Sequence, residues 1–146
     1  MAMQEALGRL FNTVIPGNDT YVSLRDAAGV TFLLFEAGVG STVTITFAAD
    51  ASGTGSVTPD SIDHYYGAKK ATSSGAWHRT AVNPASEAFT KSSSTEDVVA
   101  VEVLASMCPD GKPWVKCTSG GSGTVVPILH DLAYQRAPQS LRSVIA

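Results

Sequence analysis

Three histidines are the side chains in this sequence best suited to acid–base catalysis or metal binding. His64 follows Asp63 directly, and His130 precedes Asp131, so each could pair with a carboxylate. However, His64 and His78 fall on neighbouring predicted strands among aromatic residues, where a histidine is usually a hydrogen-bonded sheet residue. Adjacent residues such as His130 and Asp131 point to opposite faces of a strand. We therefore expect no catalytic residue, no metal site and no bound cofactor.

Other patterns that support catalysis are missing from the sequence. Serine is abundant, but no Gly-x-Ser-x-Gly nucleophile elbow occurs, and the glycine-rich stretch 120–123 lacks the lysine of a phosphate-binding loop. The carboxylates show no spacing that would fix a two-carboxylate glycosidase site. The sequence therefore predicts a binding or structural protein rather than an enzyme.

The two cysteines, Cys108 and Cys117, flank the turn-forming stretch 109–113. This placement predicts that they face each other across a hairpin. Reduced thiols are favoured over a disulfide, because reducing conditions in a cytoplasm oppose structural disulfides. A zinc site is less favoured still, since four ligands are normally needed and no further Cys or His lies at ligand spacing.

Four aromatic residues could line a carbohydrate-binding face, because exposed rings stack on sugar rings. The alternative is that they form a half-buried cluster that stabilises the sheet, and this is the favoured interpretation. The four residues are Tyr65, Tyr66, Trp77 and Trp114.

Composition limits the classes of partner. The chain has 146 residues, of which 44% are hydrophobic and only 16% charged, with a formal net charge of −3. Its densest basic pair, 69–70, is too small to hold a nucleic acid backbone, and its longest apolar run, 30–35, is far too short to cross a bilayer. Such a neutral surface suits a protein in an assembly. We expect synthesis in the cytoplasm, without a nucleic acid or membrane partner.

The elements that position these residues are predicted to be strands. Residues 42–47 alternate threonine with Val43, Ile45 and Phe47, which we expect to face the core. The apolar run 30–35 predicts a central strand and, with 42–47, a hairpin.

Later segments continue the β pattern. Residues 62–66 and 76–82 predict a second hairpin in which the aromatic residues pair, with a helix over 59–70 as the alternative. Residues 97–105 predict a strand that returns through the turn at 110–111 into a strand at 114–118, and 124–133 predicts the last strand. The fold class is an all-β antiparallel sandwich or barrel, with an extended N-terminal arm and a C-terminal tail.

The predicted organisation has an arm over residues 1–19, a β domain over 20–136 and a tail over 137–146. Both ends carry apolar side chains that are too few to form a core of their own. The alternative is that both ends fold back on the β domain. We expect contacts with other proteins to come from these ends: Leu7, Leu10, Phe11, Gln135, Arg136, Pro138, Leu141, Val144 and Ile145.

Several segments in this order resemble a group of small virion proteins from tailed phages that infect actinobacteria. The segments are 30–36, 42–46, 64–66, 75–77, 97–103, 109–111 and 128–141. The resemblance implies a minor capsid or decoration protein that binds the outside of an assembled icosahedral head. The partners it implies are the major capsid protein and sister subunits in a symmetric oligomer, with a trimer favoured. A head–tail connector or tail subunit, and a carbohydrate-binding module on the particle, remain the alternatives.

Overall fold

The computed structural model of the chain describes residues 19–35, 41–68, 76–91, 97–120 and 123–132. Apart from Asp19, the predicted arm and tail lie outside these residues. The described part contains nine strands and one short 3-10 helix: β1 (Val22–Ser23), β2 (Ala27–Phe35), β3 (Thr42–Ala48), β4 (Ile62–Ala68), β5 (His78–Ser86), β6 (Ala88–Thr90), β7 (Val98–Leu104), η1 (Ala105–Met107), β8 (Trp114–Ser119) and β9 (Thr124–Leu132).

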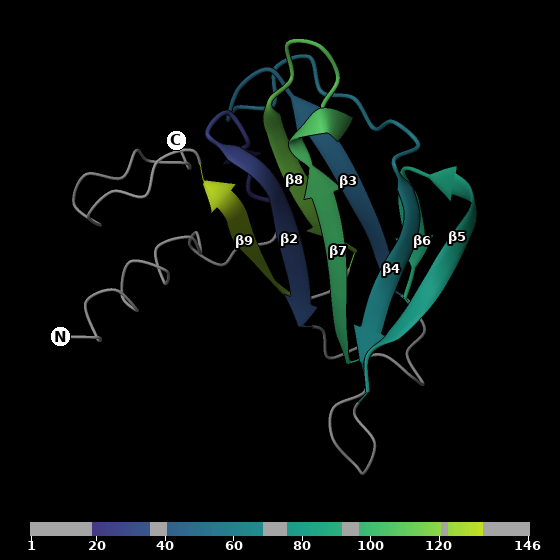
Figure 1. Ribbon diagram of the computed structural model, residues 1–146. Coiled ribbons are helices and arrows are strands. Elements are labelled where there is room, and N and C mark those ends of the chain that lie inside the picture. The colour runs from purple at the N-terminus through teal and green to yellow at the C-terminus, as the bar shows by residue number, and fades with distance from the viewer. Residues whose placement is uncertain (1–18, 36–40, 69–75, 92–96, 121–122, 133–146) are drawn as a thin grey trace, which may run out of the picture.

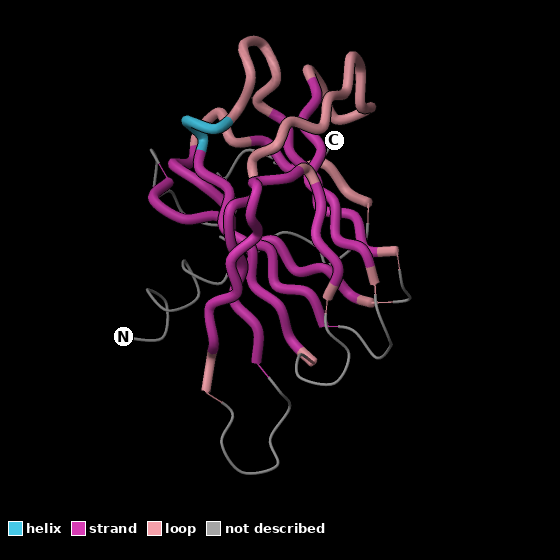
Figure 2. Tube along the Cα trace, turned by 90° about the vertical axis from the view of Figure 1, so that its right-hand side faces the viewer, coloured by secondary structure: helices cyan, strands magenta, loops and turns pink. Residues whose placement is uncertain are grey.

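The strands form two antiparallel sheets that pack face to face. The front sheet has five strands in the order β5-β4-β7-β2-β9, and the back sheet has four in the order β1-β8-β3-β6. Figure 1 looks onto the front sheet, and Figure 2 shows the two layers after a quarter turn. The prediction of an all-β antiparallel fold is confirmed, and the architecture is the sandwich rather than the barrel.

The core lies between the sheets and is built from one side of each alternating strand. Val43, Ile45 and Phe47 of β3 are fully buried, as predicted, and Phe32 of β2 and Val101 of β7 belong to the same cluster from the front sheet. Complete burial of one such side chain contributes about 1.5–3 kcal/mol. These residues therefore hold the two sheets together.

The predicted hairpin between 30–35 and 42–47 is wrong. As predicted, β2 is an interior strand, but its neighbours are β7 and β9 of the front sheet, whereas β3 lies between β6 and β8 of the back sheet. An alternating pattern reports which side chains face the core, not which strand lies alongside. Val30, Phe32 and Leu34 of β2 and Val43, Ile45 and Phe47 of β3 enter the same core, but from opposite layers.

The predicted hairpin between 97–105 and 114–118 is also wrong, although the turn exists. The Lys112 amide donates to the Pro109 carbonyl at 3.0 Å, and Gly111 takes a φ of +73°, which favours glycine. This turn joins β7 of the front sheet to β8 of the back sheet. Cys117 consequently lies opposite Ile45, not across a hairpin from Cys108, and both cysteines are thiols rather than halves of a disulfide.

The hairpin of β4 and β5 is confirmed, and the alternative helix over 59–70 is wrong for residues 62–68, which form β4. The predicted pairing of its aromatic residues is not observed. Tyr65 lies opposite Thr80 and stacks on Phe89 of the back sheet, with ring centroids 4.0 Å apart. Tyr66 lies opposite Arg79 on the other face. Tyr65 thus closes the core between the sheets instead of forming a cross-strand aromatic pair.

Candidate interaction surface

The outer side of the front sheet carries a row of apolar side chains across four strands. Leu33 of β2 lies opposite Ala100 of β7 on one side and Val126 of β9 on the other. Ala100 in turn lies opposite Tyr66 of β4. All four alternate with buried residues of the same strands, so they point away from the core.

Further apolar residues lie on both sides of this row, and three exposed large apolar side chains of the described residues are found on this face. Phe35 lies opposite Val98 on one side of the row. On the other side Leu104 lies opposite Gly29, beyond the pair formed by Thr31 and Glu102. Phe35 is 46% exposed, Tyr66 42% and Leu104 41%. We call the following residues the apolar face: Leu33, Phe35, Tyr66, Val98, Ala100, Leu104, Val126 and Ile128.

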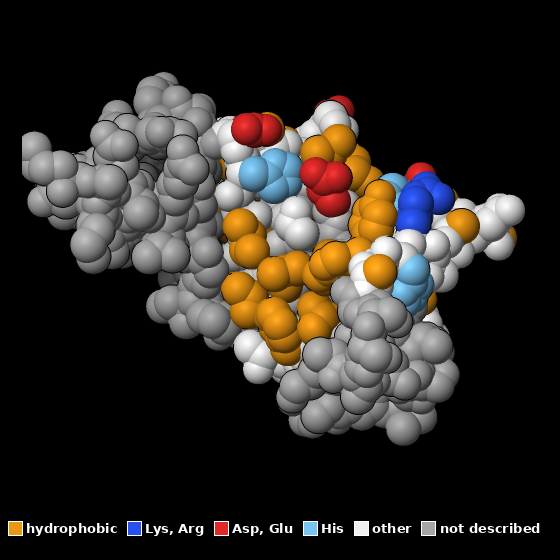
Figure 3. All heavy atoms as spheres, turned by 60° about the horizontal axis from the view of Figure 1, so that its bottom comes forward, with side chains coloured by type: hydrophobic (Ala, Val, Ile, Leu, Met, Phe, Trp, Pro, Cys, Tyr) orange, Lys and Arg blue, Asp and Glu red, His pale blue; other side chains and the backbone are white. Residues whose placement is uncertain are grey.

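Figure 3 shows apolar side chains gathered over the front sheet, with histidine and acidic side chains beyond them. Exposed apolar residues are common singly on soluble proteins, but a contiguous patch with a polar border is typical of an interaction site. The apolar face is therefore the candidate interaction surface of the described residues.

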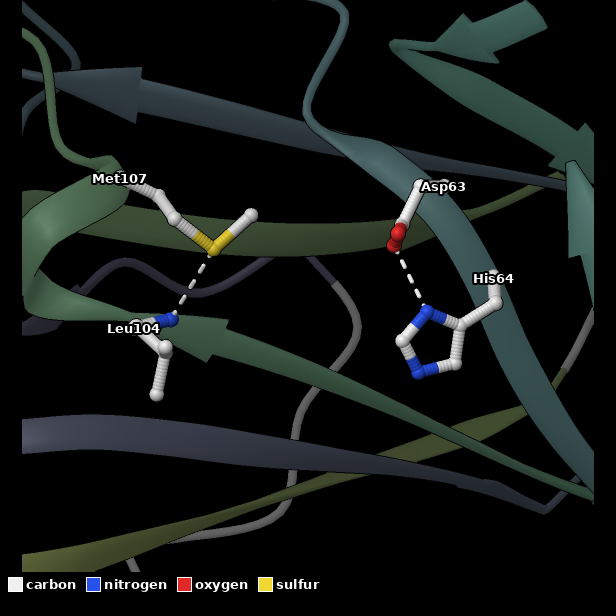
Figure 4. Close-up of polar contacts among 4 residues, drawn as sticks. All are labelled: Asp63, His64, Leu104 and Met107. Atoms are coloured by element: carbon white, nitrogen blue, oxygen red, sulfur yellow. Dashed lines mark hydrogen bonds and ion pairs between the residues drawn. The ribbon is translucent and has the colours of Figure 1, made fainter. Parts of the chain in front are cut away.

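Asp63 and His64 form one polar pair at the border of this face. The Asp63 Oδ1 and His64 Nδ1 atoms are 2.7 Å apart, and the His64 ring meets the Tyr66 ring edge to face. Figure 4 shows the Asp63 carboxyl group and the His64 ring turned toward each other. This hydrogen bond from His64 holds the pKa of the Asp63 carboxyl below its usual value. Asp63 is thus an ionised carboxylate at neutral pH.

Glu102, His130 and Asp131 are polar residues at the other end of this face, where Glu102 lies between Ala100 and Leu104 on β7. The His130 Nε2 atom is 3.5 Å from Glu102 Oε1, and its Nδ1 atom is 3.9 Å from Asp131 Oδ2. The three carboxylates Asp63, Glu102 and Asp131 keep most of their side-chain surface in solvent, with 69%, 58% and 86% exposed. Pairing with histidine leaves them accessible to a partner.

The end of β7 is held by a contact within the chain. The Leu104 amide donates to the Met107 sulfur of η1 at 3.3 Å, as drawn in Figure 4. Met107 and Ala105 also pack against the core. Leu104 is thereby fixed at the edge of the apolar face, because the turn after it is anchored.

A different polar cluster lies on the back sheet. Lys116 contacts Asp19, Thr118 donates to the same carboxylate at 3.0 Å, and the Lys116 ammonium lies 4.8 Å from the centre of the Tyr21 ring. The hydrogen bond from Lys116 is the main cause that lowers the pKa of Asp19. This cluster ties the chain before β1 to β8 and is best explained as structural.

The four aromatic residues considered for a sugar site do not share one surface. Tyr65 is buried, and Trp114 of β8 lies in the back sheet opposite Ser23 and Ala48. Tyr66 and Trp77 remain exposed, Trp77 by 52%. Sequence reasoning grouped them because it could not assign each ring to a sheet.

The histidines likewise lie apart. His64 and His78 are on the paired strands β4 and β5, as predicted, whereas His130 is on β9 at the opposite edge of the front sheet. In the described ranges, no three His, Cys, Asp or Glu side chains are grouped so that they could hold a metal ion. The same ranges contain no helix that is long and apolar enough to span a membrane.

The nine residues predicted to contact partners all lie outside the described residues: Leu7, Leu10, Phe11, Gln135, Arg136, Pro138, Leu141, Val144 and Ile145. The apolar face was missed by the sequence analysis. One available signal was the unbroken apolar run from Phe32 to Phe35, because a strand that is apolar at consecutive positions is apolar on both faces.

No protein-family model, curated protein or solved structure matches this chain.

Proposed function

We propose that this protein is a structural component of a tailed-phage virion, a minor capsid or decoration protein that binds the outer surface of the icosahedral head and stabilises it. The observation that carries the proposal is the apolar face, exposed on a sandwich whose core is already complete. Because Phe35, Tyr66 and Leu104 are not needed inside, their exposure supports a role in binding a partner surface. The resemblance of the sequence to virion proteins suggests the particle.

The sandwich suits such a role mechanically. A protein that stabilises a shell acts through modest contacts repeated by symmetry, so its binding surface must keep its shape at every copy. Here the apolar face lies on strands that are hydrogen-bonded to each other and packed over a buried core. Little side-chain or backbone freedom would be lost on binding, which favours affinity.

No chemical step is proposed for this chain. The protein acts by binding the major capsid protein, and it associates with sister subunits in a symmetric oligomer, with a trimer favoured. Its place is the capsid surface of the virion after synthesis in the host cytoplasm.

Separation of heads from tails tests the proposal. Purified particles would be dissociated, heads and tails separated by density, and the protein quantified in each fraction by mass spectrometry. A decoration protein remains with tail-less heads and rebinds to heads assembled without it. Recovery in the tail or neck fraction alone would support a connector or tail subunit and contradict the proposal.

A further inference from the structure

We propose that the apolar face is the surface that docks on the head, and that its partner is a protein surface with apolar side chains bordered by lysine or arginine. This inference rests on the proposed function and deepens it, since it assigns both the surface and the chemistry of the partner.

The register of the front sheet aligns apolar side chains across four strands. Tyr66, Ala100, Leu33 and Val126 stand side by side on four adjacent strands. A partner that covers this row removes a continuous apolar strip from water, which stabilises a complex by about 25 cal/mol per Å² of apolar surface before the costs of association. On the back sheet, by contrast, the described residues include one large exposed apolar side chain, that of Val57, which pairs with Phe47 of β3.

The composition of one edge indicates a protein partner. Tyr66 lies opposite Arg79, and Trp77 immediately precedes β5, all with exposed side chains. Tyrosine, tryptophan and arginine are the residues most enriched among those that dominate binding energy in protein interfaces. This edge therefore has the composition of an anchor for a protein surface.

The charge at the border defines the partner further. Asp63, Glu102 and Asp131 are exposed carboxylates beside the apolar face, and Arg79 is one exposed cation of the described residues on the same side. Complementary charge across an interface guides association and rejects wrong partners. A surface with lysine or arginine beside its apolar residues matches this border.

The same charges argue against a second copy of this chain as the occupant. A two-fold interface brings the same patch of both subunits together. The carboxylate-rich border would then meet itself, and juxtaposed like charges weaken binding. A two-fold pairing of this chain through the apolar face is therefore disfavoured.

Binding of variants to heads assembled without the protein tests the inference. The test variant is the double substitution Phe35→Ser and Tyr66→Ser, and the matched control is Val57→Ser, whose side chain is 37% exposed away from the apolar face. We expect the control to bind as the wild type does and the double variant to bind at least about ten-fold more weakly, the effect of losing about 1.4 kcal/mol. Thermal unfolding of the double variant and of the control checks that both remain folded.

A charge variant tests the chemistry of the partner. Glu102→Lys is expected to weaken head binding, with a larger loss at low salt than at high salt, because salt screens exposed charges. Unchanged or tighter binding by this variant would overturn the basic character of the partner.

The outcomes separate the inference from the function on which it rests. If the wild-type protein fails to bind heads, the proposed function is wrong and the inference falls with it. If the wild type and the double variant bind equally well, the docking surface is wrong while the function stands. If the double variant binds heads normally but loses self-association in sedimentation, or loses binding on a glycan array, the occupant is a second copy or a sugar, and the inference is overturned.

Discussion

Gly29 and His130 lie opposite each other on β2 and β9, and the His130 ring occupies the space above the glycine where a side chain would stand. A Cβ atom at position 29 would be 2.7 Å from His130 Cε1 and 2.9 Å from the Val103 carbonyl oxygen. The glycine thus makes room for the histidine that contacts Glu102. The sequence analysis did not predict this contact.

Gly29→Ala should therefore destabilise the protein, by about 1–3 kcal/mol, the usual cost of overpacking. The imidazole can move, but the carbonyl of Val103 belongs to the neighbouring strand, so adding His130→Ala should restore only part of the loss. Urea denaturation of the single and double variants measures this, with His130→Ala alone as the control. A Gly29→Ala variant as stable as the wild type would contradict the assigned packing.

The stacked pair Tyr65 and Phe89 joins the two sheets. Phe89 is 7% exposed and Tyr65 5%. We predict that Phe89→Ala lowers the free energy of unfolding by about 3–5 kcal/mol, the range for buried aromatic truncations. The neighbouring Tyr66→Ala serves as the control and should change stability by at most about 0.5 kcal/mol, as surface substitutions do. Similar losses for the two variants would show that the assignment of inward and outward faces in β4 is wrong.

The predicted strands and the observed neighbours show what sequence reasoning could and could not establish. The period of two in 42–47 correctly placed Val43, Ile45 and Phe47 in the core, because it depends only on local geometry. The partner of Ile45 is Cys117, far away in the chain, and nothing local in either strand specifies that pairing. Both wrong hairpins came from the assumption that consecutive strands are neighbours.

The apolar face escaped prediction for a related reason. The type of an apolar residue does not show whether its side chain points into a core or out to solvent. Leu33 and Phe35 therefore could not be distinguished from core residues in the sequence. Only the register of the sheets shows that Phe32 and Leu34 fill the core and that their neighbours face outward. The contact residues predicted at the two ends of the chain stay predictions.

Acid should weaken the contact between Asp19 and Lys116. The pKa of Asp19 is lowered chiefly by the hydrogen bond from Lys116, so the folded protein holds the Asp19 proton less tightly than the unfolded chain does. The resulting stabilisation is complete above the ordinary aspartate pKa of about 3.9 and is lost as the pH falls through the lower folded value. Asp19→Asn should therefore lower stability at neutral pH and flatten the acid limb of a plot of unfolding free energy against pH.

Asp60→Asn, an exposed carboxylate, is the control for this experiment. Its unfolding free energy is measured over the same pH range as that of Asp19→Asn. If Asp19→Asn and Asp60→Asn give the same profile as the wild type, the contact with Lys116 contributes nothing to acid stability.

The two thiols should differ in reactivity. Burial raises the pKa of Cys108, which leaves less of the reactive thiolate at neutral pH, and Cys117 is only 1% exposed. N-ethylmaleimide should modify Cys108 slowly in the native protein and Cys117 only after unfolding in urea, as measured by peptide mass spectrometry. Equal modification of both in the native protein would contradict the placement of Cys117 in the core.

Cryo-electron microscopy of the source particle tests the central claim most directly. The account predicts density for this sandwich at symmetry-related positions on the outside of the head, with β2, β7 and β9 turned toward the shell so that Leu33 and Phe35 are covered. Density confined to the neck or tail, or no density on the particle, would contradict the account.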